Sequence, residues 1–198
     1  MLNKPFAESC EQNKQVILNV LKEVFAEPGT VFEIGSGTGQ HAVYFTEHMP
    51  HLYWQPSDLP DQIPGMCMWI GEVEHNRIHA PHELDVTADE WPVVLADYVF
   101  TANTTHIVSW EKVQDMFAGI GRMLRTGGVF AQYGPFNYGG QYTSESNARF
   151  DQWLKDRDPQ SGIRNFEDLQ RLAEQHGLKL YADYEMPANN RTLVWRKV

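Results

Sequence analysis

The sequence predicts an α/β fold in which a mostly parallel, Rossmann-like sheet is covered by helices on both faces. Two observations lead to this prediction. Strand-like apolar segments alternate with helical segments, and a glycine-rich turn at residues 35–39 joins the first strand to the next helix. Strands that alternate with helices of about ten or more residues form right-handed crossovers and a parallel sheet. The glycine-rich turn adds a feature typical of nucleotide-binding α/β proteins.

The expected elements follow one another in a regular order. Apolar positions with helical spacing after Ser9 predict an N-terminal helix that ends at Pro28-Gly29. Strands are expected at residues 30–34, 52–56, 78–84, 98–102, 129–133, 179–184 and 192–196. Further helices are expected at residues 40–48, around 66–73, and at 109–124, 144–155 and 165–176. No helix separates the last two strands, so we expect an antiparallel hairpin at one edge, because a parallel return needs about a dozen residues.

Composition limits the possible functions. The chain has 198 residues, 42% of them hydrophobic and 21% charged, so we expect a single domain over residues 1–198. The net charge of −10 argues against a nucleic-acid partner, since such proteins gather Lys and Arg on one face. No apolar stretch is long enough to span a membrane. Two cysteines without metal-ligand spacing favour a reducing, cytoplasmic setting and predict no metal site, and no feature specifies an oligomeric state.

The glycine-rich turn is the first candidate binding site. Gly35, Gly37 and Gly39 lack a Cβ, so the backbone can approach a ligand, and the following helix offers free N–H groups to an anion. A tight turn without a ligand is the alternative. A dinucleotide fingerprint needs a further glycine at position 40, where this chain has Gln40. NAD and FAD are therefore disfavoured.

Two acidic residues follow the turn at the ends of the next two predicted strands. Asp58 lies about 20 residues after the last glycine, where a carboxylate can accept hydrogen bonds from both ribose hydroxyls. Asp85 repeats this arrangement one strand further on and could accept from an adenine amino group. Each could equally cap a helix or close a turn.

Residues 31–39, Val-Phe-Glu-Ile-Gly-Ser-Gly-Thr-Gly, resemble the first motif of class I S-adenosylmethionine-dependent methyltransferases. The resemblance implies S-adenosylmethionine as the cofactor and a seven-stranded sheet with an antiparallel last strand, which agrees with the order of elements. The residues implied to bind this cofactor are Glu33, Gly35, Ser36, Gly37, Gly39, Asp58 and Asp85. Glu33 and the glycine backbone would hold the methionine part, Asp58 the ribose and Asp85 the adenine.

A closer resemblance covers nearly the whole chain. Its motifs are Gln12-Asn13-Lys14, Gln40-His41-Ala42, Trp54-Gln55-Pro56-Ser57-Asp58, Leu84-Asp85-Val86-Thr87, Tyr133-Gly134-Pro135-Phe136, Ser146-Asn147 and Met186-Pro187-Ala188-Asn189-Asn190. Together these motifs resemble the methyltransferase-like 26 family. That family is assigned as methyltransferase mainly by its fold, so the resemblance implies fold and cofactor and leaves the methyl acceptor open.

The loop after the fourth predicted strand carries the candidates for catalysis. Enzymes that methylate bases or glutamine often have Asn-Pro-Pro-Tyr there, whereas this chain has threonines in place of both prolines, which disfavours base methylation. His106 is the candidate general base because imidazole titrates near neutral pH. Asn103 could accept from a substrate amine or from the cofactor. Alternatively, His106 is an ordinary polar loop residue, and Asn103 closes a turn.

Five further residues are candidates for binding the acceptor: Tyr133, Phe136, Asn137, Asn189 and Asn190. The first three follow strand five, where aromatic faces can stabilise a cationic methylsulfonium. Phe136 could equally pack in the core. Asn189 and Asn190 fall in the turn of the expected hairpin, where Asn is also favoured because it tolerates left-handed backbone angles.

These patterns predict an S-adenosylmethionine-dependent methyltransferase that acts on a small-molecule acceptor at oxygen, nitrogen or sulfur. The alternative is a catalytically inactive protein that binds S-adenosylmethionine in a regulatory or scaffold role. A nucleotide-dependent oxidoreductase is disfavoured because Gln40 replaces the glycine that its fingerprint requires.

Overall fold

The computed structural model describes residues 3–91 and 95–198, so residues 1–2 and 92–94 of the expected single domain lie outside the described residues. The helices are α1 (Glu8–Val24), α2 (Gln40–His48), α3 (Ile63–Ile70), α4 (Trp110–Met123), α5 (Glu145–Arg157) and α6 (Phe166–Gln175). The strands are β1 (Gly29–Ile34), β2 (Leu52–Asp58), β3 (His82–Glu83), β4 (Ala96–Ala102), β5 (Leu124–Gly134), β6 (Phe136–Asn137), β7 (Arg164–Asn165), β8 (Leu178–Met186) and β9 (Asn190–Lys197). A short 3-10 turn, η1 (Pro187–Asn189), joins β8 to β9.

Within the described residues, seven strands form one sheet in the order β3-β2-β1-β4-β5-β9-β8. Neighbouring strands from β3 to β5 run parallel, whereas β9 runs antiparallel to both β5 and β8. The predicted α/β fold and its antiparallel edge hairpin are therefore confirmed. The strand order changes direction between β1 and β4, and open α/β sheets bind ligands beyond the carboxyl ends of the strands at such a point.

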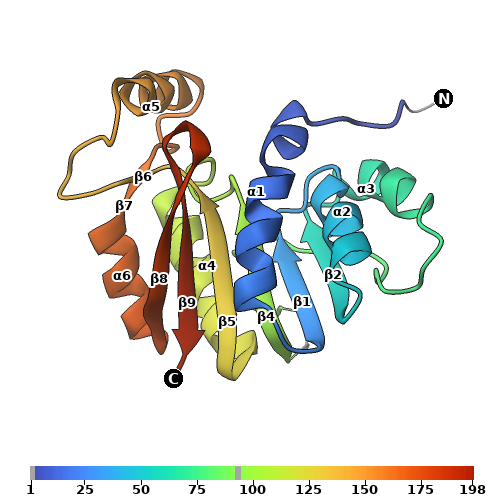
Figure 1. Ribbon diagram of the computed structural model, residues 1–198. Coiled ribbons are helices and arrows are strands. Elements are labelled where there is room, and N and C mark those ends of the chain that lie inside the picture. The colour runs from blue at the N-terminus through green and yellow to red at the C-terminus, as the bar shows by residue number, and fades with distance from the viewer. Residues whose placement is uncertain (1–2, 92–94) are drawn as a thin grey trace.

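Helices cover both faces of the sheet. Successive side chains of a strand point to opposite faces, so apolar residues of one strand pack against helices on both sides. Val31 of β1 packs with α1 and α2 in one apolar cluster, and Phe32 packs with α4 and α6 in the other. Figure 1 shows α1 in front of the sheet and α4 behind it. Helix α5 stands apart from these layers, above the carboxyl ends of the parallel strands (Figure 1).

The third strand is shorter than expected. The sequence predicted a strand over residues 78–84, whereas β3 has two residues. Ile78 pairs with Trp54 of β2 as an isolated bridge, and regular pairing resumes only at β3. Pro81 lies between them, and proline has no N–H to donate to a neighbouring strand. Asp85 consequently lies in a loop beyond the strand.

Local hydrogen bonds define the segment that carries α5. Ser144 Oγ accepts from Asn147 N at the start of α5, as the predicted cap Ser109 does from Lys112 N at the start of α4. Strands β6 and β7 pair in parallel, which the sequence did not predict, and close the intervening chain with α5 into a loop above the sheet. Among the described residues, no helix is both long and apolar enough to cross a membrane.

Candidate functional site

The glycine-rich turn after β1 adopts a backbone that favours glycine. Gly35, Gly37 and Gly39 have φ angles of 71°, 55° and 83°, which lie in the left-handed region. A Cβ on Gly35 would lie 2.6 Å from Thr104 Oγ1, whereas one on Gly37 would meet no described heavy atom within 4 Å. The turn is therefore packed against the β4 loop at Gly35 and open at Gly37, where a ligand can approach the backbone.

Glu33 lies beneath this turn with its side chain buried. Its Oε2 accepts a hydrogen bond from Trp54 Nε1 at 2.8 Å, and its backbone oxygen accepts from Ser57 Oγ at 2.6 Å. Burial raises the pKa of Glu33 to about 7, although the hydrogen bond from Trp54 acts to lower it. Ser36 Oγ accepts from Ser57 N at 3.1 Å and so joins the turn to β2. A cation beside Glu33 would favour its ionised form.

Asp58 ends β2 and faces the turn. Its Oδ2 accepts from Gly37 N and its Oδ1 accepts from Leu59 N, both at 2.7 Å. Burial raises the pKa of Asp58, while these two hydrogen bonds act to lower it. A carboxylate oxygen has more than one lone pair. Asp58 can therefore hold the turn and still accept a hydrogen bond from a ligand.

Asp85 lies in an exposed turn. Its Oδ1 accepts from Thr87 N at 3.0 Å and from Thr87 Oγ1 at 2.9 Å, and these hydrogen bonds lower the pKa of Asp85. This side-chain turn corresponds to the alternative that the sequence left open for Asp85. Among the described residues, no group of three or more His, Cys, Asp and Glu side chains is placed to hold a metal ion.

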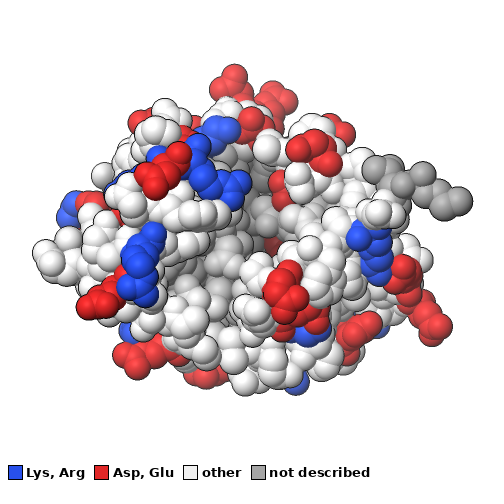
Figure 2. All heavy atoms as spheres, turned by 90° about the horizontal axis from the view of Figure 1, so that it is seen from above, with Lys and Arg blue, Asp and Glu red and all other residues white. Residues whose placement is uncertain are grey.

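A cavity of about 900 Å³ lies at the carboxyl ends of β4 and β5, and the loop after β4, which contributes Asn103 and His106 to its lining, also packs against Gly35 through Thr104. Its walls come from α1, the loop after β4, the end of β5, α5 and the hairpin turn η1. Figure 2 views this end of the molecule from above and shows the surface hollowed near its centre. Small-molecule sites commonly have volumes of about 300–1,000 Å³. The cavity is therefore large enough for a small-molecule ligand.

His106 lines the cavity and is 4% exposed. Its ring packs edge-on against Phe150 of α5, with 5.4 Å between the ring centroids. Its backbone oxygen accepts from Gly162 N at 2.9 Å. Burial, reinforced by the nearby Arg164 guanidinium, lowers the pKa of His106 to about 4. This pKa lies below the near-neutral range of an ordinary imidazole, so His106 is neutral at pH 7 and is a weaker base than the sequence suggested.

The structure brings four other predicted residues to the same cavity: Asn103, Tyr133, Asn189 and Asn190. Asn103 and Asn189 each have a φ of 57°, so both also serve as turn residues. Asn190 Nδ2 donates to the Tyr133 hydroxyl at 3.0 Å, which joins the hairpin turn to the end of β5. For Asn189, the turn role and the cavity role that the sequence left as alternatives coexist, whereas Asn190 is extended at the start of β9, with a φ of −91°, and lines the cavity.

Phe136 and Asn137 lie outside the lining of this cavity. Phe136 is 2% exposed and packs in the apolar cluster with α4 and α6. Asn137 is buried where β6 pairs with β7. The pairing of β6 with β7 thus carries both residues away from the cavity that Tyr133 lines, although the sequence grouped them with Tyr133.

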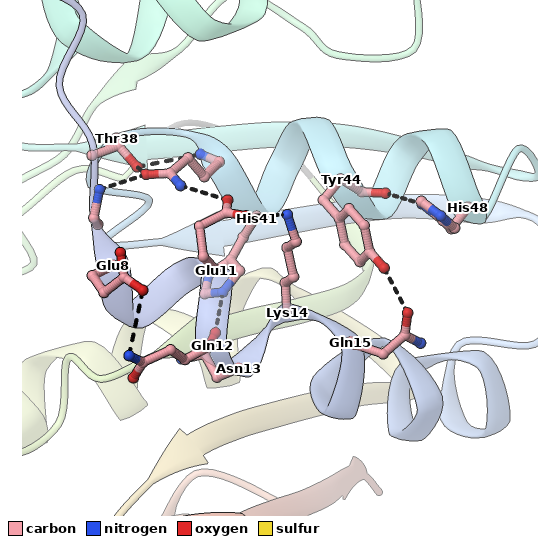
Figure 3. Close-up of polar contacts among 12 residues, drawn as sticks. Glu8, Glu11, Gln12, Asn13, Lys14, Gln15, Thr38, His41, Tyr44 and His48 are labelled. Atoms are coloured by element: carbon pink, nitrogen blue, oxygen red, sulfur yellow. Dashed lines mark hydrogen bonds and ion pairs between the residues drawn. The ribbon is translucent and has the colours of Figure 1, made fainter.

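One wall of the cavity was not predicted from the sequence. Helix α1 contributes Ser9, Gln12, Asn13 and Val16 to the lining. Polar contacts tie this part of α1 to α2 (Figure 3): His41 Nε2 donates to Asn13 Oδ1 at 2.7 Å, and Gln40 Nε2 donates to Glu11 Oε1 at 2.8 Å. Burial lowers the pKa of His41 to about 4. The motifs around Asn13 and His41 that carried the family resemblance were a signal for this contact.

A second wall, on α5, was also missed as part of the site. Helix α5 contributes Ser146, Asn147, Phe150, Trp153, Leu154 and Arg157. Their spacing of three or four residues is the sequence signal for one helix face. Arg164, which follows α5, donates to the backbone oxygens of Thr105 and Val108 and so fixes the loop that carries His106.

Residues 4–197 match a family described as "Protein of unknown function (DUF938)". The chain belongs to the DUF938 family. The match spans the glycine-rich turn, Asp58, both helical walls of the cavity and the edge hairpin. The complete site described above therefore lies within the DUF938 region.

Solved structures with the fold of this DUF938 chain include methyltransferases. The S-adenosylmethionine-dependent methyltransferase SibL in its apo form has a TM-score of 0.80 and 19% identity over 96% of this chain and 55% of its own. An O-methyltransferase family protein from Burkholderia thailandensis has a TM-score of 0.80 and 16% identity, over 96% of this chain and 57% of its own. Human N-acetylserotonin methyltransferase, in complex with S-adenosylmethionine, has a TM-score of 0.80 and 17% identity, over 96% of this chain and 53% of its own. The DUF938 chain shares their fold and spans about half their length.

Proposed function

We propose that this DUF938 protein is an S-adenosylmethionine-dependent methyltransferase that acts on a small-molecule acceptor. The observation that carries the proposal is an open glycine-rich turn, with Asp58 facing it, next to a cavity that contains His106. Gly35 packs against Thr104, and the adjacent Asn103 lines the cavity, so the two parts meet at the loop after β4. The shared fold with methyltransferases, one of them in complex with S-adenosylmethionine, supports the proposal.

The residues around the turn fit this cofactor. Gly37 leaves its backbone open on the side that a Cβ would fill, and Asp58 keeps lone pairs for ribose hydroxyls. Glu33 in its ionised form complements a cationic amino group, and the exposed Asp85 can accept from an adenine amino group. When bound, S-adenosylmethionine supplies a methyl group activated by a sulfonium.

The cavity residues would orient the acceptor. Methyl transfer is an in-line displacement, in which holding the reacting atoms at near-attack distance contributes most of what the protein can supply. His106 is neutral and so can accept a proton or a hydrogen bond from the acceptor. Asn103 and Tyr133 add an amide and a phenol to the same wall. We propose that the methyl group is transferred to an oxygen, nitrogen or sulfur atom of the acceptor that lies against His106, Asn103 and Tyr133.

Calorimetry on the purified protein tests the cofactor. S-adenosylmethionine and S-adenosylhomocysteine should bind, and NAD should not. Asp58→Ala should weaken binding by about 1–3 kcal/mol, the scale of charge-assisted hydrogen bonds to ribose, in a protein that still folds but has a lower melting temperature, because Gly37 N and Leu59 N lose their acceptor. Asp61→Ala, at an exposed position in the following loop, is the matched control and should bind as the wild type does. NAD binding without any response to the two methionine-derived compounds would overturn the proposal.

Turnover separates the enzyme from an inactive binding protein. The protein is incubated with a labelled methyl donor and a metabolite extract, and labelled small molecules are separated and identified. We expect a labelled product that depends on His106 and is absent from a heat-treated control. Cofactor binding without any labelled product would favour a regulatory or scaffold role.

We also propose a relationship to the methyltransferase-like 26 family. The supporting observation is that two of the motifs quoted for it, residues 12–14 and 40–42, contact each other in the structure through the hydrogen bond between Asn13 and His41. Motifs that meet in space are expected when they serve one site.

A further inference from the structure

Helix α5 turns an apolar face toward the cavity instead of the core. The cavity-lining residues of α5 recur at helical spacing, with Phe150, Trp153 and Leu154 in the middle of the stripe. Trp153 is 50% exposed, although it is the largest side chain of the helix. An apolar side chain of this size left open at the wall of a cavity is typical of a ligand-binding surface.

The aromatic rings of this face lie nearly parallel to each other and form one aromatic surface. The rings of Phe150 and Trp153 lie at 18° to each other with 5.7 Å between their centroids. The His106 ring meets Phe150 at 72°, with 5.4 Å between centroids, so the histidine stands at the edge of the surface. Aromatic rings favour offset-stacked contacts with other planar rings. A planar ring of a ligand would therefore find partners next to His106.

Arg157 places a positive charge over the Trp153 ring. Its guanidinium carbon lies 4.6 Å from the centroid of the Trp153 ring. Across the described chain Arg157 makes no ion pair, whereas the other cations of α5, Arg149 and Lys155, pair with Glu145 and Asp151. A guanidinium presents a rigid fork of N–H donors that matches a carboxylate. The charge of Arg157 therefore favours an anionic ligand.

The amides of the cavity leave acceptor atoms for the ligand. Asn147 Nδ2 donates to Thr143 Oγ1 and to the Asn189 backbone oxygen, at 2.9 and 3.0 Å. Asn189 Nδ2 donates to Ser146 Oγ, and Asn190 Nδ2 donates to the Tyr133 hydroxyl. The NH₂ group of each of these three amides thus donates within the protein, whereas their side-chain carbonyl oxygens accept no hydrogen bond from the described residues and can accept one from a ligand. A ligand hydroxyl or amino group supplies the donor.

We propose that the cavity takes a planar aromatic acid that carries a hydroxyl or amino group. Its ring packs on Phe150 and Trp153, its carboxylate pairs with Arg157, and its hydroxyl or amino group lies among the amides beside His106. The proposal rests on the proposed function only in making this hydroxyl or amino group the methyl acceptor. Binding of the acid itself depends on α5 and the asparagines alone.

Calorimetry with three probes tests the ligand class. The probes are 4-hydroxybenzoate, its neutral analogue 4-hydroxybenzamide, and the non-planar acid 4-hydroxycyclohexanecarboxylate, each titrated with and without S-adenosylhomocysteine. We expect 4-hydroxybenzoate to bind about 10-fold or more tightly than either analogue, the scale of one hydrogen-bonded charge pair. Equal affinity for the acid and the amide, or no binding by any probe, would overturn the proposal.

Two matched variants assign the preference to Arg157. Arg157→Gln should bring the acid and the amide to within about twofold of each other, because the neutral side chain no longer favours a carboxylate. Arg149→Gln, on the same helix but outside the cavity lining, should keep the wild-type ratio. An unchanged ratio in Arg157→Gln would contradict the assignment. Failure of S-adenosylhomocysteine to bind, with the acid preference intact, would instead count against the proposed methyl transfer alone.

Discussion

Helices α1 and α5 both line the cavity, but different forces hold them in place. Four apolar residues of α1 are buried in the sheet-facing cluster: Ile17, Leu18, Val20 and Leu21. In α5, Leu154 is buried together with two polar residues, Asn147 and Asp151. Since each buried aliphatic side chain contributes about 1.5–3 kcal/mol, the apolar attachment of α1 is several times that of α5.

The polar anchors of the two helices also differ. In α1, Asn13 is held by the buried His41, whose ring packs parallel to Phe45 with 5.2 Å between centroids. In α5, Asp151 accepts from Ile163 N at 2.7 Å and from the Tyr142 hydroxyl and Lys155 Nζ, both at 2.6 Å. The anchor of α1 is thus embedded in the core, whereas that of α5 joins it mainly to neighbouring loops.

This difference separates a fixed wall from an adaptable one. Helix α1 is positioned by the same core that holds the sheet, so it should change little between ligand states. Helix α5 carries the residues proposed to contact the acceptor and is attached mainly by hydrogen bonds. Segments with few buried apolar contacts open locally at a lower free-energy cost than core segments do. Selectivity for the acceptor would then lie on the less firmly held wall.

We expect the largest effect on stability from a substitution that removes the polar anchor of α1. His41→Ala leaves a space next to Phe45 and Phe100 and removes the hydrogen bond to Asn13. We expect the free energy of unfolding at pH 7 to fall by about 2–4 kcal/mol in denaturant titrations. The exposed His48→Ala should change it by less than about 0.5 kcal/mol. Equal effects of the two substitutions would show that His41 does not anchor α1.

Acid should weaken the anchor of α1 before that of α5. Burial lowers the pKa of His41 to about 4 from an ordinary value of 6.5. The unfolded chain therefore binds the proton first, and stability is lost as pH falls from about 6.5 towards 4, by up to about 3 kcal/mol. Burial acts to raise the pKa of Asp151, but hydrogen bonds from Lys155, Tyr142 and Ile163 lower it overall. Its contribution persists until pH falls below the ordinary range for Asp, about 4.

The test of this order compares unfolding curves of the wild type and His41→Gln at several pH values. The comparison is needed because Glu33, with a pKa raised to about 7, loses its stabilising effect in the opposite direction, as pH rises. We expect the difference between the two proteins to shrink as pH falls from 6.5 to 4. A constant difference across this range would rule out titration of His41 as the cause.

His106 packs against Phe150 of α5, so its substitution tests the chemistry at this less firmly held wall. We expect His106→Gln to lower kcat by about 100-fold, at the low end for loss of a general base, because burial has already weakened the imidazole as a base. Affinity for S-adenosylmethionine should be unchanged. The two quantities are measured side by side once an acceptor is in hand. A loss of cofactor affinity would place His106 in the donor site instead.

The smallest effect concerns the anchor of α5. Asp151→Asn removes a buried charge that accepts three hydrogen bonds, and we expect a loss of about 1–3 kcal/mol. Hydrogen exchange should speed up in residues 145–163 and stay unchanged in α1. Asp156→Asn, exposed on the same helix, is the control. Equal protection of residues 145–163 in both variants would show that α5 does not depend on this anchor.

Features that depend on neighbouring residues were predicted from the sequence better than features that depend on distant segments. The turn at Gly35, Gly37 and Gly39 and the position of Asp58 were readable because neighbouring elements determine them. The shortening of β3 was missed although Pro81 was its signal. The pKa of His106 could not be predicted, and core packing of Phe136 stayed one of two alternatives, because both depend on segments distant in the sequence, around Arg164 and on α6.

The same limit explains why the two walls of the cavity were missed. The helical stripe of α5 was present in the sequence, but an apolar stripe alone does not say whether it faces a core or a cavity. For α1, the residues that line the cavity lie between Ser9 and Val16, and the apolar residues buried against the sheet follow them from Ile17 to Leu21, so the apolar pattern of the helix marks only its second half. Only the placement of the hairpin turn and the β4 loop above the sheet defines which side is open.

The half-exposed indole of Trp153 gives the protein an optical property of its own. Of its six tryptophans, Trp54 and Trp195 are fully buried, so their fluorescence is insulated from solvent, whereas Trp153 lies at the cavity wall. A molecule that settles against this indole displaces water from it and changes the colour and intensity of its emission. Because Trp69, Trp91 and Trp110 are only partly buried and emit as well, occupancy of the cavity is followed in the unlabelled protein as the part of the change in emission that Trp153→Phe abolishes.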